Sequence, residues 1–393
     1  MSRINDLIKE MCPNGVKYLE LYKVIKWNKR FSGVNKEWQP EIVSIKSNVS
    51  AQELKSLALD SGNIKLLSTG NFDGYTDRSV YTGDVNDLEV ITIPSGGTAN
   101  IKYYNGQFIN SGNIIGTSTD YDKYYLKYIY YCLLNKNELV QSFFRGSSVQ
   151  HPDMKQIIQI KIPIPPLEVQ KEIVRILDKF GELEAELEAE LEARKSQYEF
   201  WRGQMFKQNE NCKISDLYTR VKGTPITAGK MKEIEDPTGK IRIFAGGQTA
   251  VNANHEDIPK ANIIDYPCVI VQSRGLIDFV YYDKPFTFKN EMWAYTCNNQ
   301  VTVKYLYYYL KNNVNYFREI GAQMGSMPQI SLPVTEKFEM YLPSLEEQKK
   351  IVNILDKFEE LINNISIGLP TEIELRRQQY EYYRNKLLSF EEL

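Results

Sequence analysis

Two segments of the chain place apolar residues at the i, i+3, i+4, i+7 spacing of one helix face. The first stripe consists of Ile173, Ile176, Leu177, Phe180 and Leu183, continued by Leu187 and Leu191. The second stripe consists of Ile351, Ile354, Leu355, Phe358, Leu361, Ile362 and Ile365. A long helix with one apolar stripe is covered most simply by a similar helix. The pattern therefore predicts two long helices that pack on each other as a coiled coil.

The segments before each helix have a different pattern. They are punctuated by Gly and Asn and contain short β-type runs, VITIP at 90–94 and VIVQS at 269–273. A Tyr-rich stretch with helical spacing follows each run, and we expect its Tyr128, Tyr131 and Leu134 to be core residues and not base-stacking ones. The prediction is a chain of α+β class. Its mixed domains cover 1–163 and 207–342, and its helical regions cover 164–206 and 343–393.

The two halves of the chain are copies of each other. PPLEVQKEIVRILDKF at 165–180 matches PSLEEQKKIVNILDKF at 343–358 in 12 of 16 positions. KYIYYCLLN at 127–135 and QYEFWR at 197–202 recur in the same order as KYLYYYLKN and QYEYYR. A period of about 178 residues indicates a tandem duplication of a domain and its helix, not a solenoid of short units.

The spacers that continue the two helices differ. LEAELEAELEAR at 183–194 has strong helix formers and a Leu at every fourth position, which predicts a continuous, stiff, acidic helix. In the second copy Gly368 and Pro370 are expected to break the helix. Thr371 and Glu374 have the spacing of a capping box that restarts it.

Charge is divided unevenly along the chain. The sequence has 48 Lys and Arg against 50 Asp and Glu, which gives a net charge of −2. Residues 167–206 hold 10 acidic and 6 basic side chains, and 345–393 hold 10 and 7. Residues 1–166 hold 19 basic and 16 acidic side chains, and 207–344 hold 16 and 14. Mildly basic domains on acidic helices are consistent with binding of a polyanion.

The sequence offers little for catalysis. It lacks the phosphate-loop, dinucleotide, zinc-protease, nucleophile-elbow and methyltransferase motifs. Its only histidines are His151, expected to be structural or to contact the backbone, and His255, expected in a solvated loop with Glu256 and Asp257. Five scattered cysteines indicate a reduced, cytosolic chain, and neither a signal peptide nor an apolar run of membrane-spanning length is present. We therefore expect no active site and no metal site.

The repeated motifs resemble those of a known family. IPIPPLEVQKEIVRILDKF at 162–180, YLPSLEEQKKIVNILDKFEEL at 341–361, the LEAE units and the opening SRINDLIKEMCPNGVKYLEL are similar to the specificity subunit of type I restriction-modification systems. The resemblance covers essentially the whole chain. It implies target recognition domains at 1–163 and 207–342, each reading one half of a split double-stranded DNA target. The helical spacer regions would pack antiparallel, fix the separation and dock two methyltransferase subunits.

The resemblance also implies where the chemistry lies. This chain would be non-catalytic and without a cofactor of its own, in a prokaryotic cytoplasm. S-adenosylmethionine would be bound by the methyltransferase partners, which methylate adenine at N6. ATP and Mg would be used by restriction or motor subunits. At 1.5 Å per residue one LEAE unit spans about 6 Å, or one to two base-pair rises, so removing Leu187–Glu190 should alter the unread gap. The alternative is that the repeats form a length-tolerant helix.

Base reading needs amide, hydroxyl or guanidinium groups on exposed loops. The predicted DNA contacts are Asn71, Arg78, Thr98, Asn100, Arg145, Ser147, Ser148, Gln248, Arg274, Gln323 and Ser326. The alternative is that nearby Gly residues only form turns and that Ser and Thr only cap helices.

Partner docking is predicted for polar helix residues that are duplicated without an evident core role. These are Gln170, Lys171, Asp178 and Lys179, with Gln348, Lys349, Asp356 and Lys357. Two equivalent surfaces imply two copies of one partner, and the alternative is that residues such as Asp178 cap or pair locally. Two rival functions are a coiled-coil adaptor without DNA specificity and a nuclease with an unrecognised site. Salt-dependent DNA binding would distinguish a specificity subunit from a coiled-coil adaptor.

Overall fold

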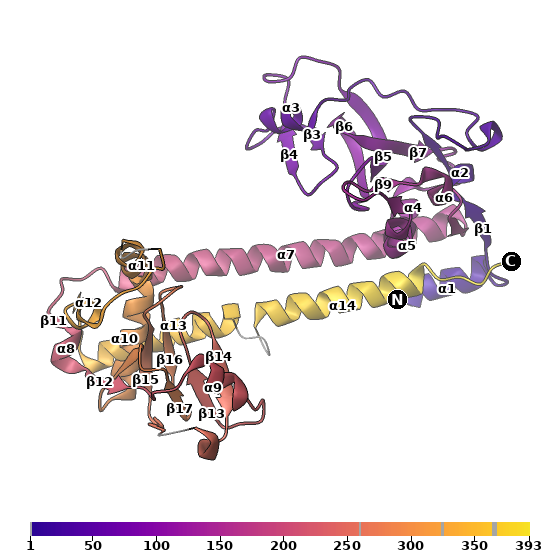
Figure 1. Ribbon diagram of the computed structural model, residues 1–393. Coiled ribbons are helices and arrows are strands. Elements are labelled where there is room, and N and C mark those ends of the chain that lie inside the picture. The colour runs from indigo at the N-terminus through magenta and orange to yellow at the C-terminus, as the bar shows by residue number, and fades with distance from the viewer. Residues whose placement is uncertain (1, 259–260, 324–325, 364–367) are drawn as a thin grey trace. The chain divides into compact units, whose positions relative to one another are not determined.

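The structure is a computed structural model that describes residues 2–258, 261–323, 326–363 and 368–393. The chain forms two compact units: unit 1 is Met1–Glu186 with Glu374–Leu393, and unit 2 is Leu187–Ile373. Each unit holds one globular domain with helix segments packed against it (Figure 1). The division between units therefore falls within the long helices, whereas the predicted boundaries separate domain from helix.

Unit 1 is built on a mixed sheet with the strand order β2-β7-β5-β6-β3-β4. β3 pairs parallel with β6, and the other neighbours are antiparallel. The strands are β2 (Ile25–Trp27), β3 (Ile64–Leu67), β4 (Asp73–Thr76), β5 (Asn86–Pro94), β6 (Lys102–Asn110) and β7 (Asn113–Ser118). Two short antiparallel pairs are β1 (Lys17–Glu20) with β10 (Lys161–Ile164), and β8 (Phe144–Arg145) with β9 (His151–Pro152). The predicted strand at 90–94 is the end of β5.

Unit 1 also contains helical segments, of which α4 (Leu126–Asn135) packs on strands β5 and β6 of this sheet. The others are α1 (Ser2–Met11), α2 (Leu21–Val24), the 3-10 turn Lys36–Trp38, α3 (Ala51–Ser56), α5 (Asn137–Ser142) and α6 (Met154–Ile157). The Tyr-rich stretch is α4, whose Tyr128 is fully buried and donates its hydroxyl to the Pro163 carbonyl at 3.1 Å. Tyr131 is buried as well, and Leu134 packs against the same core. The prediction that these residues belong to the core is confirmed.

Unit 2 repeats this arrangement with its strands divided between two sheets. An antiparallel sheet has the order β12-β18-β15-β16, and a mixed one has the order β14-β13-β17, with β13 parallel to β17. The strands are β12 (Thr219–Lys222), β13 (Ile241–Phe244), β14 (Ala250–Ala253), β15 (Cys268–Gln272), β16 (Asp278–Tyr282), β17 (Phe286–Phe288) and β18 (Trp293–Thr296). A short pair joins β11 (Cys212–Lys213) to β19 (Glu339–Met340). The predicted strand at 269–273 is β15.

The helices of unit 2 are α8 (Ile214–Leu217), α9 (Ala228–Glu233), the 3-10 turn His255–Asp257, α10 (Gln300–Asn312), α11 (Val314–Ala322), α12 (Leu332–Glu336) and α13 (Leu345–Asn363). The second Tyr-rich stretch is α10, which packs on β15, β16 and α13 (Figure 1). Its Tyr305 and Tyr308 are fully buried. The duplicated sequence thus produces the same helix-on-sheet core in both units.

The long helices begin two or three residues inside the predicted helical regions, 164–206 and 343–393. α7 (Leu167–Met205) is one unbroken helix of 39 residues, and its start follows Pro165 and Pro166. In the second copy the helix is interrupted between α13 and α14 (Leu369–Leu387), which confirms the predicted break, and Ile365 lies outside the described residues. The predicted restart at Thr371 is wrong. The Thr371 N–H already donates to the Gly368 carbonyl at 3.1 Å, so the helix begins before that residue.

The apolar stripes are buried against a neighbour that the pattern did not predict. Ile173 and Leu177 are fully buried in the core of unit 1, together with residues of α4. Ile351 and Leu355 lie in the core of unit 2 against α10. The buried residues of the stripes therefore pack against the globular domains. Ile354 of the second stripe remains 40% exposed.

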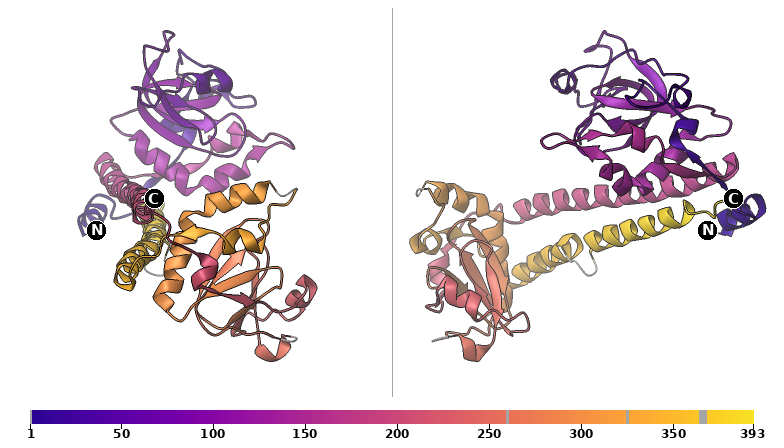
Figure 2. Two further views of the ribbon diagram at one scale, coloured as in Figure 1. Left: turned by 90° about the vertical axis from the view of Figure 1, so that its left-hand side faces the viewer. Right: turned by 45° about the vertical axis from the view of Figure 1, so that its right-hand side comes forward.

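Aromatic contacts join the long helices to each other within each unit. The parts of α7 and α14 that belong to unit 1 lie side by side (Figure 2). There the Phe180 ring stacks on Tyr383 at 5.4 Å, and Glu184 pairs with Arg377 at 2.6 Å. Phe180 contacts Tyr383, whereas Glu184, four residues later in α7, contacts Arg377, six residues earlier in α14. The two helices therefore run antiparallel. In unit 2 the contact between α7 and α13 is made by Tyr198 and Phe358, whose rings lie 6.1 Å apart.

A carboxylate lies in the second of these contacts. Glu359 Oε1 accepts hydrogen bonds from the hydroxyls of Tyr198 at 3.3 Å and Tyr307 at 3.1 Å. Burial raises the pKa of Glu359 above its ordinary value, although these hydrogen bonds oppose the shift. At the offset of 178 the first copy has Gly181, so this position carries no carboxylate in unit 1.

Replacing Glu359 by Gln should change how stability depends on pH. The raised pKa means that folded protein holds this proton more strongly than the unfolded chain. The contribution of Glu359 is therefore greatest below the ordinary glutamate pKa and is lost as the pH rises through the raised value. The amide does not titrate, so the variant should gain stability relative to wild type as the pH rises. Urea unfolding from about pH 4 to about pH 8 measures this difference. The exposed neighbour Glu360→Gln should follow the wild-type profile, and parallel profiles for E359Q and wild type would contradict the prediction.

Candidate nucleic-acid interface

Three loops of unit 1 meet around Ser95. They are the β3–β4 loop (68–72), the β5–β6 loop (95–101) and the β8–β9 loop (146–150). The Gly97 N–H donates to the Gln150 carbonyl at 2.8 Å, which joins the second loop to the third. The Asn100 side-chain amide donates to the Gly70 carbonyl at 2.9 Å, which joins the second loop to the first. Residues as far apart in sequence as Gly70 and Gln150, which are separated by 80 positions, are thereby held on one surface.

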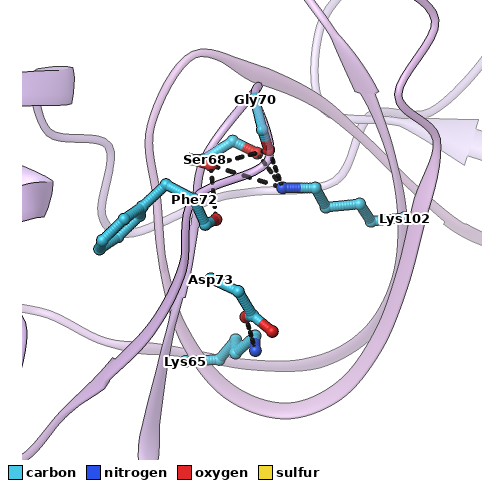
Figure 3. Close-up of polar contacts among 6 residues, drawn as sticks. All are labelled: Lys65, Ser68, Gly70, Phe72, Asp73 and Lys102. Carbon is cyan, nitrogen blue, oxygen red and sulfur yellow. Dashed lines mark hydrogen bonds and ion pairs between the residues drawn. The ribbon is translucent and has the colours of Figure 1, made fainter. Parts of the chain in front are cut away.

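Lys102 holds the β3–β4 loop in place through hydrogen bonds to its backbone. Its ammonium donates to the carbonyls of Ser68 at 2.7 Å and Gly70 at 2.6 Å, as Figure 3 shows. Burial lowers the pKa of Lys102. On the neighbouring strand Lys65 pairs with Asp73 (Figure 3). The loop that carries Asn71 is therefore held by side chains that do not themselves reach outward.

Unit 2 joins the corresponding loops in the same way. The Gly275 N–H donates to the Pro328 carbonyl at 2.8 Å, and the Gly247 N–H donates to the Arg274 carbonyl at 3.0 Å. The first of these bonds matches the Gly97–Gln150 bond at an offset of 178 for both partners. Gly97 and Gly275 have φ values of 102° and 78°, a left-handed conformation that favours glycine. The backbone bond between the second and third loops is thus the same in both copies, whereas the first and second loops are joined by a side-chain bond in unit 1 and a backbone bond in unit 2.

Strand register identifies further equivalent positions. Lys65 lies opposite Phe108 in unit 1, and Arg242 lies opposite Phe286 in unit 2. Asn71 lies six residues after Lys65, and Gln248 lies six residues after Arg242. These two loop residues therefore occupy equivalent positions. The offset of 178 likewise pairs Arg145 with Gln323, and Ser148 with Ser326. Both members of each of these pairs are among the predicted DNA contacts.

The structure places most of the predicted DNA contacts on the exposed surface of these loops. The exposed residues are Asn71, Thr98, Arg145, Ser147, Ser148, Gln248, Arg274, Gln323 and Ser326. Asn100 is half-buried, and its amide is used within the loops. Arg78 is exposed but lies in the turn after β4, where its guanidinium donates to the Gly83 carbonyl at 2.7 Å. Contact of these residues with DNA stays a prediction.

Sequence reasoning missed basic residues beside the same surface. A pocket next to Ser95 is lined by Lys29, Arg30, His151 and Lys155, among other residues. Lys29 and Arg30 follow β2, and Lys155 lies in α6. Lys29 and Arg30 precede Ser95 by 65 residues or more, whereas Lys155 follows the β8–β9 loop by five residues. Only the run Asn28-Lys29-Arg30 gave a local signal, a short basic patch after a strand.

Comparison with known proteins agrees with this duplicated architecture. The family model for the type I restriction modification DNA specificity domain matches the chain twice, at residues 29–193 and 206–375. The chain belongs to this specificity family. It is 32% identical to the EcoR124I/EcoR124II specificity subunit of Escherichia coli, over 92% of this chain and 96% of that protein. It is 30% identical to a putative type I restriction enzyme specificity subunit of Haemophilus influenzae, over 92% and 97%.

Solved structures share the fold of this specificity-family chain. The type I restriction-modification S subunit from M. genitalium has a TM-score of 0.63 at 16% identity, covering 96% of this chain and 97% of that one. A chain from a structural study of assembly and conformational transition of the type I restriction-modification system has a TM-score of 0.56 at 14% identity, covering 96% and 98%. Each family match spans one globular domain and much of the helix that follows it, as the internal repeat predicts.

Half of the predicted docking residues of this family member have roles within the fold. Gln170 is fully buried, accepts from the Tyr125 N–H at 2.9 Å and donates to the carbonyls of Lys123 and Pro165. Its counterpart Gln348 is buried and donates to the Pro343 carbonyl at 2.8 Å. Buried amides are not available to a partner in this structure, which corrects the docking prediction for both.

The duplicated aspartates also act within the fold. Asp178 pairs with Lys127 at 2.6 Å and accepts from the Tyr131 hydroxyl at 2.5 Å. Asp356 makes the same two contacts with Lys304 at 2.8 Å and Tyr308 at 2.5 Å. The local-pairing alternative thus accounts for their duplication. The remaining docking candidates are exposed on the helices: Lys171, Lys179, Lys349 and Lys357.

The described parts of the chain hold neither a cluster of metal ligands nor a helix of membrane-spanning character. Within 2–258, 261–323, 326–363 and 368–393, no group of three or more His, Cys, Asp or Glu side chains could hold a metal ion. The triplet His255–Asp257 forms an exposed 3-10 turn, as its interpretation as a solvated loop predicts. No helix in the same ranges is long and apolar enough to cross a membrane.

Proposed function

We propose that this chain is the non-catalytic DNA-recognition subunit of a type I restriction-modification complex. Each globular domain reads one half of a bipartite double-stranded target, and the helices set the spacing between the halves. The observation that carries the proposal is the loop surface of the two units, where an equivalent backbone bond joins two loops and most of the equivalent side chains differ. A duplicated frame with exchanged side chains suits two readers of different short sequences.

The side chains at equivalent loop positions have the chemistry of base recognition. The pairs are Asn71 with Gln248, Arg145 with Gln323, and Ser148 with Ser326. Amides and guanidinium groups can make bidentate hydrogen bonds to adenine or guanine edges, and hydroxyls can bind bases or phosphates. The basic excess of both globular domains supports approach to the DNA backbone.

The helices carry duplicated exposed groups that support docking of two methyltransferase subunits. Phe200 on α7 and Tyr382 on α14 occupy equivalent positions of the repeated QYE blocks. They are 58% and 59% exposed, although each is a large aromatic side chain. Exposed aromatic residues are frequent anchors of protein interfaces, and their duplication favours two copies of one partner. The exposed lysines of the docking prediction belong to the same proposal.

The proposal assigns the chemistry to partner subunits. Methyltransferase subunits would bind S-adenosylmethionine and methylate adenine at N6, and restriction or motor subunits would use ATP and Mg. This chain would supply sequence recognition without a cofactor of its own. The site of action would be DNA in a prokaryotic cytoplasm.

Co-expression of the chain with its methyltransferase tests the function directly. Single-molecule sequencing of host DNA should show N6-methyladenine in a bipartite motif with an unread gap. The motif should disappear when this chain is omitted. A stable complex that neither methylates DNA nor binds it in a salt-dependent way would contradict the proposal and favour the adaptor.

Lys102→Met is expected to weaken recognition by the first domain. The substitution keeps the apolar length of the side chain but removes the hydrogen bonds that hold the β3–β4 loop. We expect about a fivefold loss of affinity for the cognate duplex, the size of about one hydrogen bond. Affinity of the assembled methyltransferase complex for duplexes with one half-site scrambled measures the effect. Loss should appear only where the first half-site is intact, and the exposed Lys55→Met on α3 should bind like wild type.

A further inference from the structure

Position 151 combines a constant backbone frame with a side chain that differs between the copies. In both units the glycine of the β5–β6 or β15–β16 loop donates its N–H to the residue that precedes this position, Gln150 or Pro328. The residue that follows is His151 in unit 1 and Gln329 in unit 2. Both side chains can bind a base edge, and the frame that positions them is the same.

The contact of His151 with Ser95 determines which nitrogen of the neutral ring is a hydrogen-bond acceptor. The imidazole Nδ1 lies 2.6 Å from the Ser95 carbonyl oxygen. A carbonyl oxygen can only accept, so Nδ1 carries the proton. In the neutral ring Nε2 then has a lone pair and is a hydrogen-bond acceptor. The ring is exposed and lines the pocket that also contains Lys29 and Lys155.

Gly96 leaves room for this ring. A Cβ atom at Gly96 would lie 3.3 Å from His151 Cε1 and 3.4 Å from Nδ1, which is closer than side chains normally pack. In unit 2 the equivalent of Gly96 is Arg274, and it lies in a β-bridge opposite Gln329, which has no ring. The two positions therefore differ together between the copies: a glycine accompanies the imidazole, and a long side chain accompanies the amide.

We propose that His151 is a specificity-determining residue of the first domain. Its Nε2 accepts a hydrogen bond from the exocyclic amino group of an adenine or a cytosine at one base pair of the target. The ligand class is a base edge that donates, because the Ser95 contact leaves Nε2 as an acceptor. Lysines on the same pocket suit the phosphates that flank such a base. The inference rests on the proposed function and adds one residue, one atom and one class of base to it.

Two conservative substitutions separate reading from local structure. In His151→Asn the amide stands near the place of Nδ1, so contact with Ser95 can persist while nothing occupies the place of Nε2. In His151→Gln the amide reaches the place of Nε2. We expect H151N to lose about tenfold discrimination at one base pair of one half-site, and H151Q to retain more of it. The other half-site, read by unit 2, serves as the internal control and should not change.

The measurement is the methylation motif of the assembled complex, read by single-molecule sequencing for each variant and for His255→Ala, which alters the other histidine of the sequence. Circular dichroism melts confirm that the variants fold. Gly96→Ala should displace the ring and relax the same base pair as H151N. An unchanged motif in H151N, or broadening in H151Q but not in H151N, would overturn the inference. So would a uniform loss of methylation at all sequences, which indicates a phosphate contact.

The wild-type result keeps this test separate from that of the proposed function. A bipartite wild-type motif supports DNA recognition by the chain whatever the His151 variants do. Absence of any motif in wild type would contradict the proposed function, and the inference would be overturned with it. An intact wild-type motif with an intact H151N motif overturns the inference alone.

Discussion

Deleting Leu187–Glu190 from α7 is expected to change the unread gap of the target by one or two base pairs while both half-sites remain readable. α7 is unbroken from Leu167 to Met205, so four fewer residues shorten it by about 6 Å and turn its end by about 40°. One base-pair rise is about 3.4 Å. Because LEAE repeats, Leu191 takes the place of Leu187 and the local surface chemistry is kept.

The deleted segment lies between the contacts that join α7 to its neighbours. The contacts of unit 1 use Phe180 and Glu184, and that of unit 2 uses Tyr198. The deletion therefore removes none of these residues. Glu190 is exposed and pairs with Arg194 of the same helix at 3.3 Å, so its replacement by alanine is a control of unchanged length in which the gap should stay the same.

Methylation mapping on a library with graded gap lengths measures the change. The wild-type complex should select one gap, and the deletion variant should select another. A variant that kept the wild-type gap with full activity would support the alternative of a length-tolerant helix. A shift of base preference within a half-site at an unchanged gap would contradict the ruler interpretation altogether.

The prediction concerns α7 because the other long helical region is not one continuous helix. Gly368 lies in a bend, not in a helix, and its carbonyl accepts the first hydrogen bonds of α14. A broken helix does not transmit a fixed rise and rotation along its length. We therefore expect the length of α7, which contains the LEAE units, to have the larger effect on the unread gap.

Much of the architecture could be predicted from the sequence because the sequence contains two copies of the same domain and helix. The repeat located the helix starts after Pro165 and in the copy at Leu345, and the β-type runs and buried tyrosines lie where period and composition indicated. The neighbour of each helix stripe could not be predicted. Spacing shows that Ile173 and Leu177 need burial, but it does not say whether a helix or a domain covers them.

The candidate site was predicted in its parts and not in its assembly. Glycines and polar residues marked the loops of Asn71, Thr98 and Arg145 as exposed turns. The hydrogen bond that brings two of these loops together joins Gly97 to Gln150, and nothing in local sequence records a contact over that distance. Duplication also misled: Gln170 is repeated because the fold needs its buried amide, and repetition alone does not distinguish a fold requirement from a binding surface.

Replacing Asp178 by alanine is expected to lower the free energy of unfolding of unit 1 by about 2–3 kcal/mol. The carboxylate is 28% exposed and joins α7 to α4 through Lys127 and Tyr131. Burial, and after it the hydrogen bond to Asp178, raises the pKa of Tyr131, so the phenol stays a donor. Alanine leaves both the ammonium and the hydroxyl without this acceptor. The matched control is Lys179→Ala, which removes only an exposed pair with Glu182 and should cost less than about 1 kcal/mol.

The same substitution at Asp356 should cost less, although its two contacts are the same. Asp356 is 36% exposed, so solvent screens its pair with Lys304 more strongly. It also lies near Glu359, where its charge helps to raise the pKa of that second carboxyl. Removing Asp356 therefore relieves a repulsion that has no counterpart at Gly181. The D356A variant should bring the pKa of Glu359 back toward its ordinary value.

Calorimetry of the two single variants and the double variant tests this ranking. Because the aspartates lie in separate compact units, their losses should add within about 0.5 kcal/mol. A D178A loss no larger than that of K179A would show that the carboxylate does not hold α4 to α7. A larger loss in D356A than in D178A would show that repulsion from Glu359 does not offset the broken contacts. The duplicated aspartates thus give two measurements of one interaction, with and without a neighbouring buried charge.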